Sequence, residues 1–123
     1  MLKLLWVMLG GAVGSGARYL VVVGAARWLG HTYWGTLAVN LVGSFLLALL
    51  ATAAGASMTP TTRLALMTGL LGGFTTYSNF NYETLDFAWQ GAWWNAAGYL
   101  GGTLLLCLLG GWLGIRVGQE LGG

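Results

Sequence analysis

Charged residues are scarce in this sequence. The 123 residues include five Lys or Arg and three Asp or Glu, so 7% of the chain is charged, against roughly 25% in a soluble domain. The net charge of +2 is scattered along the chain and forms no basic patch, so we expect no nucleic-acid partner. The mean hydropathy of +0.74 instead predicts a protein that lies in a lipid bilayer.

Cysteine, histidine and proline are almost absent. Cys107 is the only cysteine and His31 the only histidine, which excludes an internal disulfide and a zinc site built from Cys and His within one chain. No nucleotide-binding P-loop is present, and neither residue has a catalytic partner at a recognisable spacing. We therefore predict that the chain is not an enzyme and that any transport it carries out is passive.

Long apolar runs make up most of the chain. A membrane-spanning helix needs about 20 residues, which leaves room for four. The first run is longer than the apolar part of a secretory signal peptide and contains Arg18, so we interpret it as a retained span. We predict a multi-pass all-α membrane protein with one transmembrane domain over residues 1–123. The predicted spans cover residues 4–26, 34–54, 64–90 and 92–117.

Glycine is abundant, with 22 residues. Inside a membrane, small residues four apart let two helix backbones approach closely, so such pairs predict helix contacts. Tryptophans near the ends of the apolar runs are expected to lie at the headgroup interface. The glycine pairs are Gly10 with Gly14, Gly69 with Gly73, Gly98 with Gly102, and Gly110 with Gly114.

The third run contains the most polar stretch of the chain, GGFTTYSNFNYET at residues 72–84. Residues 64–74 rise about 16 Å as a helix, half of the hydrocarbon thickness, so the polar stretch begins near the bilayer centre. Two glycines followed by two threonines form helix poorly, which predicts a broken third helix. The freed backbone groups must then be buried in protein or line a cavity or ion site. The alternative is a kinked but continuous helix whose hydroxyls bond preceding carbonyls.

Two further spans carry polar stripes on one helix face. The residues four apart are Thr36, Asn40 and Ser44 in the second span, and Asn95, Tyr99, Thr103 and Cys107 in the fourth. Each stripe either forms hydrogen bonds between helices or lines part of a pathway. Arg18 is the ionisable residue deep in the membrane, whereas Glu83 and Asp86 lie toward the interface. This pattern favours an anion as the species that moves along the pathway. The positive ring edges of Tyr77 and Phe80 can also face an anion. Arg18 has an alternative structural role, donating to carbonyls that the helix break sets free.

Three motifs together resemble the signatures of the Fluc (CrcB) family of fluoride channels. They are GGxxGxxxRY at 10–19, GTLAVNLVGSF at 35–45 and GGFTTYSNFNYET at 72–84, in the order and spacing of that family. The resemblance implies a passive, fluoride-selective channel that exports fluoride across the inner (plasma) membrane. It also implies an antiparallel, dual-topology homodimer of four-helix subunits with two pores and a central structural sodium ion.

The same resemblance assigns roles to particular residues. Backbone carbonyls of Gly72 and Thr75 from both subunits would hold the sodium ion. The fluoride pathway would be lined by Asn40, Tyr77, Ser78, Asn79, Phe80, Asn81, Glu83, Tyr99 and Thr103. The usual family run TTFSTFS reads TTYSNFN here, so Tyr77 replaces a phenylalanine and Asn79 and Asn81 replace hydroxyl residues. These departures bear on conductance and selectivity.

Three alternatives remain open from the sequence. A small multidrug exporter would need a glutamate in its first span, whereas residues 4–26 contain no carboxylate and do contain Arg18. A noncatalytic assembly subunit would use the polar stripes as glue alone. If both termini lie on one side of the membrane, that side carries three basic residues, Lys3, Arg63 and Arg116, and the opposite side carries Arg27. This charge bias would allow a single orientation in the membrane. The chain would then pair with an oppositely oriented partner protein instead of forming a homodimer.

Overall fold

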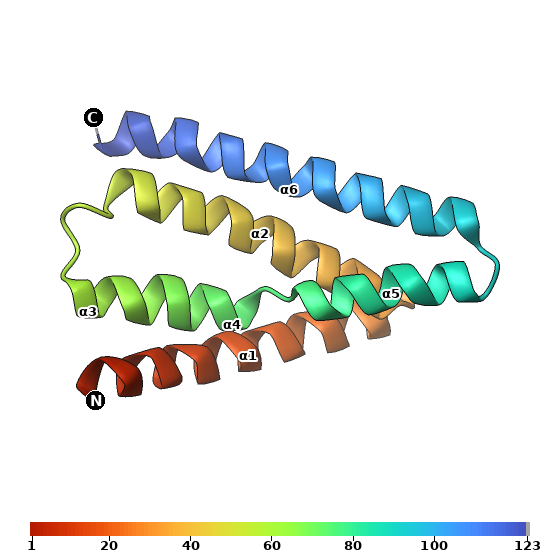
Figure 1. Cartoon of the computed structure of the whole chain (residues 1–123), viewed down its shortest axis with the longest axis horizontal. Coiled ribbons are helices and arrows are strands. Elements are labelled where there is room, and N and C mark those ends of the chain that lie inside the picture. Colours follow the sequence, from red (N-terminus) through yellow and green to blue (C-terminus); the bar gives the residue numbers. More distant parts are fainter. Residues whose placement is uncertain (123) are drawn as a thin grey trace.

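The structure, a computed structural model, describes residues 1–122, and all of its regular elements are helices (Figure 1). The third run of the sequence, at residues 64–90, forms three consecutive segments and is preceded by one short helical turn, whereas each of the other three runs forms one long helix. The predicted all-α architecture is therefore observed over the described chain. The elements are α1 (Leu2–Leu29), α2 (Thr32–Ala53), α3 (Pro60–Arg63), η1 (Leu64–Leu71), α4 (Gly72–Phe74), α5 (Tyr77–Trp89) and α6 (Trp93–Gly122).

Three of these helices, α1, α2 and α6, are long and apolar enough to cross a membrane. The third crossing is made in two pieces, with α3, η1 and α4 before an interruption and α5 after it, so neither piece alone meets that length (Figure 1). The segment η1 has π-helical hydrogen bonding, which nothing in the sequence predicted. Four crossings bring both termini to the same end of the molecule (Figure 1).

Glycine determines which helices meet closely. A Cβ atom added to Gly10 or Gly14 would overlap backbone atoms of Ala65 or Leu70, and one added to Gly73 would lie 2.7 Å from the Gly11 carbonyl oxygen. The predicted glycine contacts therefore pack α1 against η1 and α4. On the other side of the molecule, Gly110 and Gly114 bring α6 onto α2 in the same way, against Leu41 and Phe45.

The pair Gly98 and Gly102 behaves differently. A Cβ atom at either position would have no heavy atom within 4 Å. The predicted close helix contact is thus not made within one chain, because the two glycines line an open pocket of about 450 Å³ between α6, α2 and α5. This glycine surface is open to lipid or to another protein.

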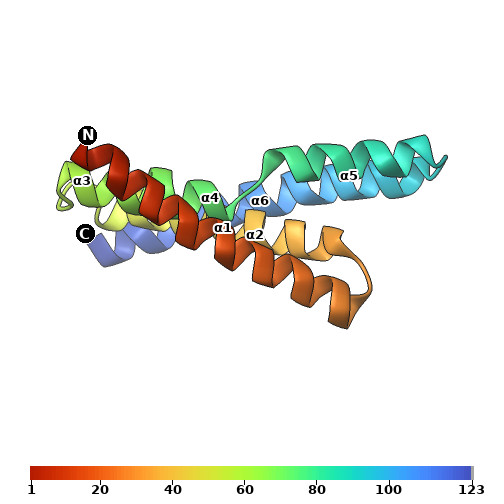
Figure 2. The same cartoon turned by 90° about the horizontal axis from the view of Figure 1, so that it is seen from below.

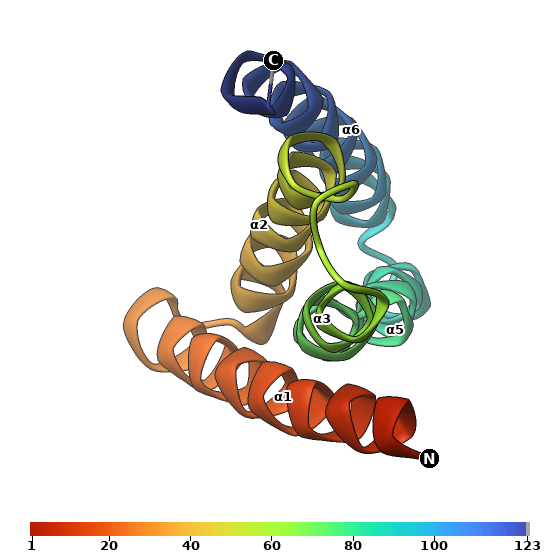
Figure 3. The same cartoon turned by 90° about the vertical axis from the view of Figure 1, so that its left-hand side faces the viewer.

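The chain is splayed and has a small core. In the end view, α1 lies along one side while α2 and α6 run together (Figure 3). Beyond the interruption α5 leaves α1, and the two helices make no contact in the described chain (Figure 2). The buried apolar side chains of residues 1–122 are Val39, Leu71, Phe80 and Ala96. Most large apolar side chains instead face outward, as expected for a protein surrounded by lipid.

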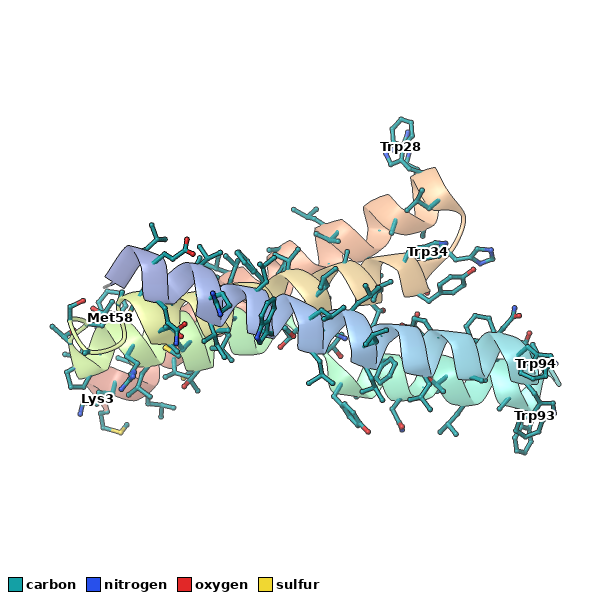
Figure 4. All side chains as sticks on the ribbon, turned by 90° about the horizontal axis from the view of Figure 1, so that it is seen from above. Lys3, Trp28, Trp34, Met58, Trp93 and Trp94 are labelled. Atoms are coloured by element: carbon teal, nitrogen blue, oxygen red, sulfur yellow. The ribbon has the colours of Figure 1, made fainter. Side chains whose placement is uncertain are left out.

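Tryptophans gather near the end opposite the termini. Trp28, Trp34, Trp93 and Trp94 lie toward that end, whereas Lys3 and Met58 lie at the other (Figure 4). All four indoles are exposed, in agreement with an anchoring position at the headgroup level.

Candidate ion pathway

The third helix is interrupted at Thr75 and Thr76. Both residues have extended backbone, with φ −86° and ψ 158° at Thr75 and φ −151° and ψ 114° at Thr76. The alternative of a kinked but continuous helix is therefore wrong. Gly72 and Gly73 are still helical, and Gly73 packs closely against Gly11 of α1. The two threonines, Thr75 and Thr76, make the break.

Asn40 of α2 clamps the extended backbone of Thr76. Its side-chain Nδ2 donates to the Thr76 carbonyl at 2.9 Å, and the Thr76 N–H donates to Asn40 Oδ1 at 2.8 Å. The amide side chain thus pairs with Thr76 as a neighbouring strand would. Because one N–H of the amide is engaged, only the second N–H is left to face an ion. The sequence pattern placed Asn40 in a polar stripe but did not reveal this structural role.

The break diverts hydrogen bonds and exposes carbonyls. In a continuous helix the Gly72 carbonyl would accept from Thr76 N–H, which is instead bound to Asn40. The Thr75 carbonyl would accept from Asn79 N–H, which instead caps α5 on Thr76 Oγ1 at 3.3 Å. Arg18 Nε donates to the Gly73 carbonyl at 3.0 Å. The Gly72 and Thr75 carbonyls are thus among the groups that lose their helical donors at the break, and neutral carbonyl oxygens are suitable ligands for a hard cation.

An open cavity of about 320 Å³ lies beside the break. It is lined by residues of five elements, namely α2, η1, α4, α5 and α6. It brings together six of the residues that the sequence assigned to the pathway and the ion site, and adds Ser44 and Cys107. Of its aromatic rings, Phe80 is buried and Tyr77 is exposed, and their centroids lie 5.9 Å apart in an edge-to-face arrangement. The predicted residues that line this cavity are Asn40, Gly72, Thr75, Tyr77, Phe80 and Thr103.

Thr103 is the polar residue without a partner in this cavity. The residue is 4% exposed, and its Oγ1 accepts and donates no hydrogen bond within the described chain. An unpartnered buried hydroxyl costs about 1–3 kcal/mol, so such groups usually face water or a ligand. Thr103 therefore marks a point where the cavity can supply a donor to an ion.

Aromatic side chains continue outward from the cavity. The Tyr99 ring lies 5.4 Å from Phe80, 5.7 Å from Tyr33 and 5.9 Å from Phe87, in each case edge-to-face. Its hydroxyl donates weakly to the Tyr33 carbonyl at 3.5 Å. The sequence analysis missed Tyr33 and Phe87, although Phe87 follows Phe80 by seven residues and so lies on the same helix face.

Glu83 lies at the outer end of this aromatic group. Its Oε1 accepts from Thr36 Oγ1 at 2.6 Å, and its Oε2 accepts from Thr32 Oγ1 at 3.4 Å. Thr36 is almost fully buried, so the first residue of the α2 stripe holds the carboxylate in place. A further cavity of about 330 Å³ lies beyond, lined by His31, Glu83 and Asp86 among others.

The remaining predicted residues of α5 lie on other faces of that helix. Ser78 and Asn81 are exposed and do not line the central cavity. Asn79 faces a separate groove of about 240 Å³ that also includes Thr36, Tyr82 and Glu83. A single chain therefore does not bring all of the predicted pathway residues to one route, because consecutive residues of a helix point in different directions.

Comparison with known proteins identifies the family. The model of the family described as CrcB-like protein, Camphor Resistance (CrcB), matches residues 5–115. This chain belongs to the CrcB family. The resemblance noted from its three motifs is thereby confirmed.

Curated relatives of this CrcB-family chain carry the name fluoride-specific ion channel FluC. The chain is 45% identical over 123 residues to the protein from Acidobacterium capsulatum, covering 98% of each sequence. It is 53% identical over 111 residues to the protein from Anaeromyxobacter dehalogenans, covering 88% of each. It is also 44% identical over 115 residues to that from Opitutus terrae, covering 89% of the chain and 87% of the relative.

Membership of the CrcB family removes one alternative. A small multidrug exporter belongs to a different family, and its defining glutamate in the first span is missing here. The family and the long apolar helices instead make this chain a multi-pass membrane protein.

Proposed function

We propose that this CrcB-family chain forms a passive channel that is selective for fluoride and exports it across the inner (plasma) membrane. The observation that carries the proposal is the cavity beside the helix break, which is lined by neutral donors and ring edges, with the buried Thr103 hydroxyl left unpartnered. The relatives' name supports the choice of ion. We propose no enzymatic activity, since those relatives are named as ion channels.

The lining suits a small, strongly hydrated anion. Fluoride accepts hydrogen bonds strongly, so a dry route must replace its water with closely spaced donors. The second N–H of Asn40 and the hydroxyl of Thr103 can supply such donors. The positive edges of the Phe80 and Tyr77 rings attract the anion more weakly and so leave it free to move on. Tyr99 and Glu83 lie at the outer end of the same route.

We propose that the pathway is completed by a second, antiparallel copy of the chain, which would give two pores per homodimer. Ser78, Asn79 and Asn81 are exposed on a helix that belongs in the bilayer, where unpaired polar groups are costly against lipid. A second chain would cover them and convert them into pathway walls. The bare glycine face at Gly98 and Gly102 is a further surface that another helix can approach closely. An oppositely oriented partner protein would meet the same requirement.

A structural sodium ion at the break is part of this proposal. The Gly72 and Thr75 carbonyls would bind it, and two antiparallel chains would supply four neutral oxygens. Arg18 stabilises the break by donating a hydrogen bond to the Gly73 carbonyl, which lies in the chain between Gly72 and Thr75. The ion would supply positive charge where the helix ends in unpaired carbonyls.

Growth of a bacterium that lacks its own fluoride exporter tests the export function. Expression of this chain is expected to restore growth in fluoride-containing medium at a concentration that stops the parent strain. Restored growth would require membrane insertion of the chain, verified by immunoblot of the membrane fraction. Membrane-inserted protein that gives no protection would contradict export.

Phe80→Ile is expected to slow fluoride efflux about fivefold. The change keeps an apolar side chain but removes a ring edge worth about 1 kcal/mol to a facing group, which corresponds to roughly a factor of five in rate. Efflux from liposomes is measured with a fluoride electrode, and size-exclusion chromatography checks that the oligomer is retained. Leu85→Ile on the exposed face of α5 is the matched control. Full efflux by the Phe80 variant would remove this ring from the pathway.

Tyr77→Phe is expected to speed fluoride efflux about fivefold. The Tyr77 hydroxyl adds a donor beside the route, and a hydrogen bond contributes about 0.5–1.5 kcal/mol net, so its loss should shorten the time that fluoride stays bound. The measurement is single-channel current or efflux rate at matched protein density. Slower efflux in the phenylalanine variant would mean that the hydroxyl helps conduction instead of retarding it.

A further inference from the structure

We propose that Cys107 is a binding site for soft, thiophilic metal ions, and that a metal bound there blocks the pathway. The binding part depends only on the cavity and its thiol. The blocking part rests on the proposed fluoride function.

Cys107 lies one helical turn beyond Thr103 on α6, and both residues line the central cavity. The thiol is partly buried and is not in a disulfide. Ser44 of α2 and the thioether of Met67 from η1 line the same cavity. A small species in the cavity therefore meets one thiol, one thioether and two hydroxyls drawn from three separate elements.

Thr103 provides a second observation, besides the thiol itself, that points to a bound species at this point. Its hydroxyl is buried, unpartnered and part of the same wall as the thiol. A buried hydroxyl in that state is normally satisfied by a ligand or by water. A species held at Cys107 would occupy the space that this hydroxyl faces.

The donor set selects soft metals. Thiolate and thioether sulfur prefer soft ions, whereas carboxylates and other hard oxygens prefer magnesium or calcium. The residues that line this cavity include no carboxylate and no imidazole. Mercury(II) chloride is a suitable probe because it is small and neutral and can enter an apolar cavity.

The reaction is a ligand exchange without any change of oxidation state. The Cys107 thiol loses its proton, its sulfur bonds to mercury, and one chloride leaves, giving a Cys–S–Hg–Cl adduct, a proton and a chloride ion. The bound metal then fills part of a cavity of about 320 Å³ that Phe80 and Thr103 also line. It would therefore keep a passing anion away from these two residues. Fluoride flux should stop while the metal is bound.

The test compares three proteins, each treated with mercury(II) chloride. The native chain is expected to bind one mercury, seen by intact-protein mass spectrometry, and to lose fluoride efflux down to the rate of protein-free liposomes. Dithiothreitol should reverse both effects. Cys107→Ser should bind no mercury, and its own efflux rate should be the same with and without mercury treatment. Cys107→Ser combined with Leu108→Cys moves the thiol to an exposed position on the same helix, and should bind mercury without losing efflux.

The outcomes separate this proposal from the proposed function. Absence of mercury from the native chain would overturn the binding site. Unchanged efflux with mercury bound at Cys107 would overturn the block of the pathway. Loss of efflux in the Leu108→Cys control would also overturn it, because any thiol in α6 would then suffice. If untreated protein passes no fluoride, the channel function fails, while the mercury stoichiometry still tests the site.

Discussion

Asn40→Asp is expected to reduce fluoride efflux by about a hundredfold. Aspartate is nearly the same size but cannot donate to the Thr76 carbonyl, which now accepts from Asn40 Nδ2 at 2.9 Å. The carboxylate would lie against that carbonyl and would add a negative charge to an anion route. Losing a buried hydrogen bond and leaving its acceptor unsatisfied costs about 1–3 kcal/mol, and each 1.4 kcal/mol is roughly a tenfold change in rate.

The control for this change is Asn95→Asp, which makes the same replacement at an exposed position at the start of α6. It adds the same charge without touching the helix break, so efflux should change much less. Size-exclusion chromatography before and after reconstitution shows whether each variant keeps its assembly. Equal efflux from Asn40→Asp and the native chain would mean that the clamp on Thr76 is not needed for conduction.

Gly14→Val is expected to destabilise the protein by about 2–3 kcal/mol or to prevent its folding. A Cβ atom at Gly14 would overlap the Leu70 carbonyl oxygen and lie 2.9 Å from the Phe74 backbone nitrogen. Both of these are backbone atoms, which cannot move aside as the end of a flexible side chain would. Helix α1 would therefore have to separate from η1 and α4. Arg18, on the same helix, would then lose its bond to the Gly73 carbonyl.

Gly16→Val is the matched control, because a Cβ atom two residues along α1 meets nothing within 4 Å. The midpoint of thermal unfolding in detergent is compared by size-exclusion chromatography of heated samples. The Gly14 variant should lose its folded peak at a much lower temperature than the Gly16 variant. Similar midpoints would show that the close approach of α1 is not needed for stability.

The interrupted helix is held from two directions. Arg18 reaches it from α1 and Asn40 reaches it from α2, and each satisfies backbone groups that the break sets free. In the proposed sodium site, the Gly72 and Thr75 carbonyls would bind the ion. Asn40 also lines the central cavity beside the break, so the same side chain would contribute to the stability of the interrupted helix and to the proposed ion route.

The sequence predicted the features that depend on local composition. Long apolar runs predicted the helices α1, α2 and α6, and the polar stretch at 72–84 predicted the interruption. Glycine pairs at 10 and 14 and at 69 and 73 predicted the close packing of α1. Composition and short spacings are sufficient for such features because each signal lies within one segment of the chain; the glycine pairs predicted a close helix contact but not which helix α1 would meet.

Features that depend on contacts between distant residues were not predictable. The Asn40 clamp joins residues 36 apart in the chain, and the Tyr33, Phe87 and Tyr99 cluster joins three helices. The directions of Ser78 and Asn81 depend on the orientation of α5 after the break, and a motif alone does not specify that orientation. The empty face at Gly98 and Gly102 likewise depends on which helices happen to be near.

Fluoride efflux from liposomes tests the central claim most directly. Purified protein is reconstituted at low density into liposomes loaded with potassium fluoride and potassium chloride, and both anions are followed with selective electrodes after valinomycin is added. A fluoride-selective channel is expected to release fluoride rapidly down its gradient while chloride stays inside. Fluoride release no faster than from protein-free liposomes, with folded protein verified in the same preparation, would show that the chain is not a fluoride channel, and equal release of chloride would show that it is not selective.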